Sequence, residues 1–134
     1  MKLYPKTKSY DLPFILQALK TIEEDPARQL TITALALEVG INSFKLRVGF
    51  KQLFQTTIHQ YRLDLRLRLA KGFLEDTDLT IAEIAYKCGF DSRDGFAKRF
   101  RIKYNLSPRE WRKEQELFPA QELYSTPQMI LDVG

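Results

Sequence analysis

The feature that most constrains this chain is a repeat within its own sequence. Residues 30–41 align with residues 79–90 at an offset of 49, and Leu, Thr, Ile, Ala and Gly recur at matching places. After a serine in each copy the offset becomes 50, and Phe50 then aligns with Phe100. A repeated stretch of this length is one supersecondary unit, so we expect the chain to contain two copies of a small unit.

Each copy is predicted to form two helices joined by a tight turn. In the first copy, apolar residues recur at helical spacing after Thr31, a good N-cap residue, and Gly40 ends that helix. Asn42 or Ser43 caps the next helix, which has an inner stripe that we expect to be buried. The stripe comprises Leu46, Gly49, Phe50, Leu53 and Phe54.

The second copy follows the same plan. Thr80 begins its first helix, Gly89 ends it, and Asp91 or Ser92 caps the next helix. The inward residues of this copy are Ile81, Ile84, Ala85, Cys88, Phe96, Phe100 and Tyr104. Two helices joined by a short turn that contains glycine form the helix-turn-helix layout of many DNA-binding proteins.

A long helix is predicted between the two units, which span residues 30–54 and 79–104. The connecting segment, residues 57–75, has no proline, and its apolar residues lie about four apart. At about 1.5 Å per residue it spans roughly 30 Å, close to the ~34 Å of one DNA turn. We therefore expect it to hold the second helices of both units in successive major grooves. Its apolar stripe comprises Ile58, Tyr61, Leu65, Leu69 and Phe73.

Two further helices complete the predicted fold. One covers residues 11–25, and the other begins at Ser107, which is followed by a proline, and ends near Leu117. The apolar face of the first comprises Leu12, Ile15, Leu16, Leu19 and Ile22. We expect an all-α fold of about seven helices over residues 11–117. The tail, residues 118–134, shows no clear period and is either a loose tail or a strap across the domain.

Composition limits the classes of function that the chain can have. The net charge is +4, and residues 31–115 carry 16 Lys and Arg against 10 Asp and Glu, a balance that suits a polyanionic partner. Cys88 is the only cysteine and aligns with Val39, so we expect a small core residue and no disulfide. His59 has no His or Cys partners at ligand spacing, so neither a metal nor a cofactor is expected.

Other classes are disfavoured by what the sequence lacks. No convergent set of nucleophile, base and metal ligands is evident, so we do not expect an enzyme. The chain shows no apolar signal core and no stretch of membrane-spanning length, and a cytoplasmic location is expected.

Several motifs at fixed spacing closely resemble the signature of the AraC/XylS family. They are Arg68-Leu69-Ala70, the run from Leu79 to Ala85, Gly89-Phe90, Phe96, Phe100 and the run from Ser107 to Arg112. The resemblance covers about residues 12–112. It implies a seven-helix, two-lobed DNA-binding domain that regulates transcription at promoters, often as an activator, with double-stranded DNA and RNA polymerase as partners. Most family members carry a larger effector-binding domain before this one, so the chain resembles the minority of stand-alone members or is a fragment.

The candidate base-reading residues lie on the outward faces of the two recognition helices, residues 43–54 and 92–104. Arg and Lys can bond guanine, Asp can accept from cytosine, and small apolar side chains can meet the thymine methyl. The candidates are Phe44, Lys45, Arg47, Val48, Arg93, Asp94, Ala97 and Lys98. The resemblance implies base reading by the early positions of these helices, which include all of these except Lys45.

A second group of residues is expected to contact phosphates. It comprises Thr31, Lys51, Arg62, Arg66, Thr80, Arg101 and Arg109, which are basic or lie at helix N-termini. The alternative for any single residue is a solvated polar face. The alternative function for the whole chain is a protein-interaction module that kept the helix-turn-helix fold and lost DNA binding. The basic faces on both recognition helices argue against it.

Overall fold

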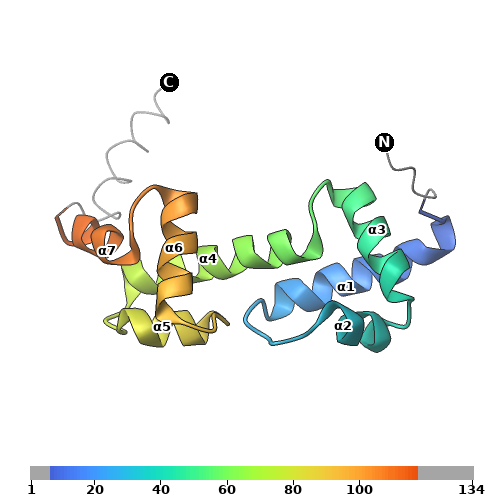
Figure 1. The fold of residues 1–134 in the computed structure, drawn as a ribbon, viewed down its shortest axis with the longest axis horizontal. Coiled ribbons are helices and arrows are strands. Elements are labelled where there is room, and N and C mark those ends of the chain that lie inside the picture. The colour runs from blue at the N-terminus through green and yellow to red at the C-terminus, as the bar shows by residue number, and fades with distance from the viewer. Residues whose placement is uncertain (1–6, 118–134) are drawn as a thin grey trace, which may run out of the picture. The chain divides into compact units, whose positions relative to one another are not determined.

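The computed structural model describes residues 7–117, which form seven α-helices after a short 3-10 turn at Ser9–Asp11 (Figure 1). The helices are α1 (Leu12–Glu24), α2 (Ile32–Val39), α3 (Ser43–Phe54), α4 (Ile58–Asp76), α5 (Ile81–Lys87), α6 (Arg93–Tyr104) and α7 (Pro108–Leu117). No strand occurs within residues 7–117, and the predicted all-α class is confirmed. The predicted tail, residues 118–134, lies outside the described residues.

The helices begin at the polar residues that the sequence offers as caps. The Thr31 hydroxyl accepts the Ala34 amide at the start of α2, and the Asn42 side chain, not that of Ser43, caps α3. Thr80 and Glu83 form a reciprocal capping box at α5. Each such bond satisfies an amide that has no partner within its helix, which stabilises that helix end by about 1 kcal/mol. Ser92, not Asp91, caps α6.

The turn in each helix-turn-helix depends on one glycine. Gly40 has φ 89° and Gly89 has φ 90°, both in the left-handed region. A Cβ atom would strain the backbone there, so glycine ends the first helix of each pair at little conformational cost. In the first copy, the amides of Gly40 and Ile41 both donate to the Ala36 carbonyl at 2.9 and 3.0 Å.

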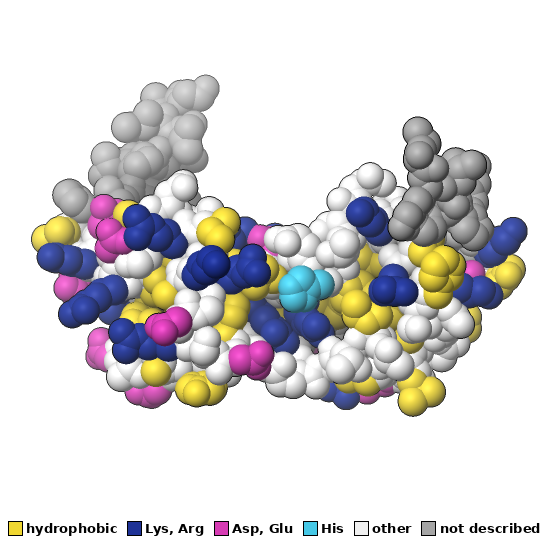
Figure 2. Space-filling view, in the orientation of Figure 1, with side chains coloured by type: hydrophobic (Ala, Val, Ile, Leu, Met, Phe, Trp, Pro, Cys, Tyr) yellow, Lys and Arg dark blue, Asp and Glu magenta, His cyan; other side chains and the backbone are white. Residues whose placement is uncertain are grey.

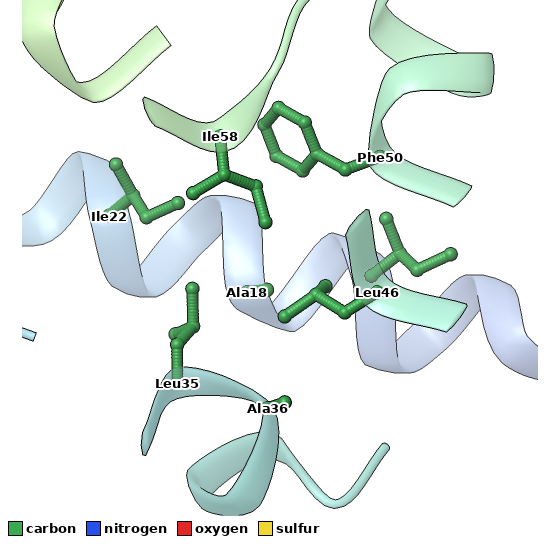
Figure 3. Close-up of a cluster of buried hydrophobic side chains, with 8 residues drawn as sticks. Ala18, Ile22, Leu35, Ala36, Leu46, Phe50 and Ile58 are labelled. Carbon is green, nitrogen blue, oxygen red and sulfur yellow. The ribbon is translucent and has the colours of Figure 1, made fainter. Parts of the chain in front are cut away.

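The chain divides into two compact units, and the boundary between Arg68 and Leu69 falls inside α4. In the first unit, α1, α2, α3 and the start of α4 enclose an aliphatic core around one buried phenylalanine (Figure 3). Its buried side chains are Ile15, Ala18, Ile22, Leu35, Ala36, Leu46, Phe50 and Ile58. Burial of these side chains from four helices is the main favourable contribution to the stability of this unit.

The second unit has a core of the same kind. Its buried apolar residues are Ala70, Leu74, Ile84, Ala85, Cys88, Phe96 and Phe100. Burial of the thiol confirms that Cys88 is a small core residue. The ring of Phe100 lies 4.7 Å from that of Tyr104 and 6.0 Å from that of Trp111, the latter edge to face. These ring contacts join α6 to α7.

Four predicted inner residues are exposed instead. Leu12, Leu16, Leu53 and Leu69 have 37%, 46%, 41% and 37% of their surface accessible. Leu16 and Leu69 each lie next to a buried residue, Ile15 and Ala70, and a step of one residue turns about 100° around a helix. The apolar pattern locates a stripe, but only packing selects the positions within it that are covered.

The repeat extends further than the sequence alignment of the helix-turn-helix units. Residues 57–62 of α4 and its cap match residues 107–112 of α7 and its cap at the same offset of 50. At an offset of 52, the buried residues Ile15, Ala18 and Ile22 of α1 match Leu67, Ala70 and Leu74 of α4, which are also buried. Each copy is therefore a four-helix set, and α4 ends the first set and begins the second.

Close packing explains the glycine inside α3. A Cβ atom added to Gly49 would clash with Cδ1 of the buried Ile15. Glycine costs a helix about 1 kcal/mol relative to alanine, and here it permits α1 to approach α3.

Phe100 is expected to anchor the second unit, since it is fully buried and its ring contacts three other aromatic rings. Phe100→Ala should lower the free energy of unfolding by about 3–5 kcal/mol. Ile102→Ala, on the same helix but 64% exposed, serves as the matched control and should change it by less than about 0.5 kcal/mol. Denaturant unfolding followed by circular dichroism measures both, and a loss below 1 kcal/mol for Phe100→Ala would contradict the assigned inner face.

Candidate nucleic-acid interface

The outward face of α3 borders a groove in the first unit. The groove has a volume of about 650 Å³ and is lined by Ile32, Phe44, Arg47, Val48, Lys51, Gln52, Gln55, Thr57, Ile58 and His59. Four of the predicted contact residues on α3 therefore line one hollow, together with the first turns of α2 and α4. Phe44 is 47% exposed, so its ring is accessible to a partner and is not part of the core.

The charges in this groove have one sign. Arg47 and Lys51 are exposed along α3, His59 is exposed on α4, and no carboxylate is among the described residues of the lining. A concave surface that combines cations with apolar side chains suits a ligand with negative charge and flat or methyl-bearing groups. Basic and apolar side chains are both visible around α3 in Figure 2.

A segment before α1 also contacts α3. The backbone amide of Thr7 donates to Oε1 of Gln52 at 3.0 Å, and its hydroxyl donates to the same atom at 2.5 Å. The ammonium group of Lys45 lies 5.8 Å from the ring centre of Tyr10. Lys45, predicted to read bases, thus lies beside the 3-10 turn, outside the groove that Arg47 lines. No local sequence pattern predicts the Thr7–Gln52 contact, because it joins residues 45 apart.

The second unit carries a smaller hollow at an equivalent place. Its volume is about 380 Å³, and it is lined by Thr80, Ile81, Ala82, Arg93, Arg109 and Arg112. Three predicted contact residues, Thr80, Arg93 and Arg109, are thus brought together. Asp94, Lys98 and Arg101 are exposed on α6, and Ala97 is half-buried. In the first unit, Thr31 is exposed and precedes Ile32, which lines the groove. The Thr31 hydroxyl accepts the Ala34 amide as a helix cap.

Two arginines predicted to contact phosphate instead bind main-chain carbonyls. In the first unit, Arg62 donates to the carbonyl of Leu30. Arg66 donates to the carbonyls of Pro26 and Arg28 at 2.6 and 3.0 Å. Burial lowers the pKa of the Arg62 guanidinium. We therefore assign these two side chains to holding the loop between α1 and α2, because the carbonyls that they satisfy have no helix partner.

The second unit repeats this arrangement with Arg112. Its guanidinium donates to the carbonyls of Leu79, Thr77 and Leu74 at 2.6, 3.1 and 3.4 Å. Leu30 and Leu79 each precede the threonine that caps the first helix of the pair, and Arg62 and Arg112 are 50 residues apart. In each unit, an arginine therefore holds the loop that leads into the first helix of the helix-turn-helix pair.

Within residues 7–117, no helix is both long and apolar enough to cross a membrane. The same residues contain no group of three or more His, Cys, Asp or Glu side chains placed to hold a metal ion.

A family profile described as "Helix-turn-helix domain" matches residues 35–114 of the chain. The HTH-type transcriptional regulator ArgR of Pseudomonas aeruginosa is 32% identical over 115 residues, which make up 86% of this chain and 35% of that protein. The melibiose operon regulatory protein of Escherichia coli is also 32% identical, over 80% of this chain and 37% of its own length. The chain therefore spans little more than a third of these curated relatives.

Solved structures show the same fold. The transcriptional regulator from Chromobacterium violaceum, described as having an AraC-type DNA-binding domain, matches with a TM-score of 0.71 and 31% identity. This match covers 84% of the present chain and 99% of that one. The DNA-binding domain of AdpA, solved in complex with a target DNA, matches with a TM-score of 0.75 at 22% identity, over 80% of this chain and 96% of its own.

Removal of an arginine that holds the loop should destabilise the fold. Arg62→Met is expected to lower the free energy of unfolding by about 1–3 kcal/mol, because it leaves a part-buried carbonyl without a donor. Arg68→Met on the same helix is the control, since that arginine pairs with Asp64 at an exposed site, and its loss should cost about 0.5 kcal/mol or less. Thermal and denaturant melts measure both, and equal losses in the two variants would contradict the assignment.

Proposed function

Because this chain belongs to the AraC/XylS family of transcriptional regulators, we propose that it binds double-stranded DNA in a sequence-specific manner and thereby regulates transcription. The observation that carries the proposal is the presence of two matched units, each with an exposed recognition-helix face beside a basic hollow. A single basic patch could be an ordinary solvated surface, whereas two copies of the same arrangement favour a repeated ligand such as a duplex.

Within each unit, we propose that the early and late positions of the recognition helix have different roles. At an offset of 50, Phe44, Arg47 and Val48 match Asp94, Ala97 and Lys98, which differ in chemistry at every position. Lys51 and Arg101 also match, and both are basic. Side chains that read bases should differ between the two recognition helices where the DNA sequences that they contact differ. Side chains that contact phosphates can stay the same, because every phosphate carries the same charge. This comparison supports base reading by the first set, together with Arg93, and phosphate contacts by Lys51 and Arg101.

Further phosphate contacts are proposed at Thr31, Thr80 and Arg109, beside the first helix of each pair. Arg62 and Arg66 are left out, because their guanidinium groups already bind main-chain carbonyls. Lys45 is retained as a contact from the first turn of α3.

We propose that the two units occupy successive major-groove segments of one duplex. α4 has 19 residues, and its length of roughly 30 Å is close to one DNA turn. RNA polymerase is the proposed protein partner, and the cytoplasm is the proposed location. The curated relatives are nearly three times as long as their matched segment, so the proposal includes a separate effector-binding domain if the present sequence is part of a longer protein.

A monomer is expected to protect two sites on DNA. Hydroxyl-radical protection of a duplex selected from a random pool should show two patches about one helical turn apart on one face. The reason is the presence of two recognition helices in a single chain. A single patch, or binding only as a symmetric dimer to a palindrome, would contradict this arrangement.

Arg47 and Lys51 should differ in what they contribute to binding. Arg47→Ala is expected to cost about 1–3 kcal/mol and to relax preference at one base position, since arginine can bond guanine in a bidentate way. Lys51→Ala should weaken binding to all sequences alike and reduce the slope of log affinity against log salt by about one unit. Fluorescence anisotropy against the selected site and its point variants measures both. Equal losses on every site for Arg47→Ala would show that the side chain does not read sequence.

A further inference from the structure

The repeat gives the single histidine of the chain a counterpart in the second unit. At an offset of 50, His59 matches Arg109, and the residues around them match as well. The hydroxyl of Thr57 accepts the Gln60 amide at 3.0 Å, and that of Ser107 accepts the Glu110 amide at 3.1 Å. His59 and Arg109 therefore occupy the same turn of equivalent helices.

Ring contacts support the same correspondence. Tyr61 lies edge to face with Phe50 at 5.8 Å, and Trp111 lies edge to face with Phe100 at 6.0 Å. The equivalent helices are thus attached to their recognition helices through the same inner residue. His59 and Arg109 then line the corresponding hollows, beside Ile32 in one unit and beside Ile81 in the other.

The charged groups that share the groove with His59 are cations. α3 contributes Arg47 and Lys51, and α2 contributes Ile32, which has no charge. On α4 itself, Arg62 lies about one turn further on and binds the Leu30 carbonyl. Among the described residues of the lining, none is a carboxylate. The imidazole itself is exposed (cyan in Figure 2).

We propose that His59 is the counterpart of Arg109 as a phosphate contact, and that it makes this contact only when its imidazole is protonated. The inference rests on the proposed DNA binding. An imidazole changes charge between about pH 5 and 8, whereas an arginine stays charged throughout that range. DNA binding by the first unit is then coupled to the uptake of one proton, while the contact made by the second unit is independent of pH.

The direction of the effect follows from the charges. A DNA phosphate placed beside the imidazole attracts a positive charge, so DNA binding favours the protonated form of His59. Affinity should therefore rise as the pH falls through the range in which imidazole titrates, and the extra contact should add about 0.9 to the steepness of the salt dependence.

The test measures affinity of the full chain for a selected duplex across a salt series at about pH 5.5 and about pH 8. For the natural sequence, the plot of log affinity against log salt should be steeper by about 0.9 at the lower pH. His59→Gln should show the shallow slope at both pH values. His59→Arg, which copies the residue of the second unit, should show the steep slope at both.

A swapped variant supplies the matched control. Arg109→His in the His59→Arg background should restore a pH-dependent slope, now from the second unit. Circular dichroism melts at both pH values verify that each variant is folded, which is expected because both side chains are exposed.

The outcomes separate this inference from the function on which it rests. Absence of salt-dependent DNA binding at either pH would refute the proposed function. DNA binding with the same slope at both pH values, or a pH-dependent slope retained in His59→Gln, would refute the role of His59. Failure of the swapped variant to restore the dependence would refute the equivalence of the two positions.

Discussion

The position of each recognition helix depends on one buried phenylalanine. Phe50 on α3 contacts the rings of Phe54 and Tyr61, and Phe100 on α6 contacts those of Tyr104 and Trp111. These rings fix the inner face of the helix against the helix that follows it. Because a helix has one inner and one outer face, the same contacts determine which side chains reach solvent and therefore a ligand. Packing in the core therefore determines which side chains form the candidate interface.

Arginine carries two kinds of role in this protein. Arg62, Arg66 and Arg112 satisfy carbonyls in the loops that lead to the helix-turn-helix pairs. Arg47, Arg93 and Arg101 are exposed on the recognition helices. The planar guanidinium suits both roles, since it can bond several acceptors at once, whether they are carbonyls, phosphates or base edges. Net charge therefore overstates the number of cations available to DNA.

The matches and differences between the two copies of the repeat account for the remaining organisation. The two copies keep the caps, the left-handed glycines, the inner rings and the arginine that holds the loop, all of which are needed for folding. They differ at Phe44 and Asp94, at Arg47 and Ala97, and at Val48 and Lys98, which face outward. A domain built in this way can read two different half-sites with one chain, because stability constrains the inner residues and leaves the outer ones free to vary.

The sequence alone determined the seven helices, the threonine caps at Thr31 and Thr80, the turn glycines and the family, because these depend on local conformational preference and on a repeat visible along the chain. Tertiary packing decided which members of each apolar stripe are covered, as at Leu16, Leu53 and Leu69. Packing also assigned Arg62 and Arg66 to carbonyls more than 30 residues away in the chain, and it brought Thr7 to Gln52. A guanidinium or a leucine has the same local preference in either setting, so only the position of distant residues could distinguish them.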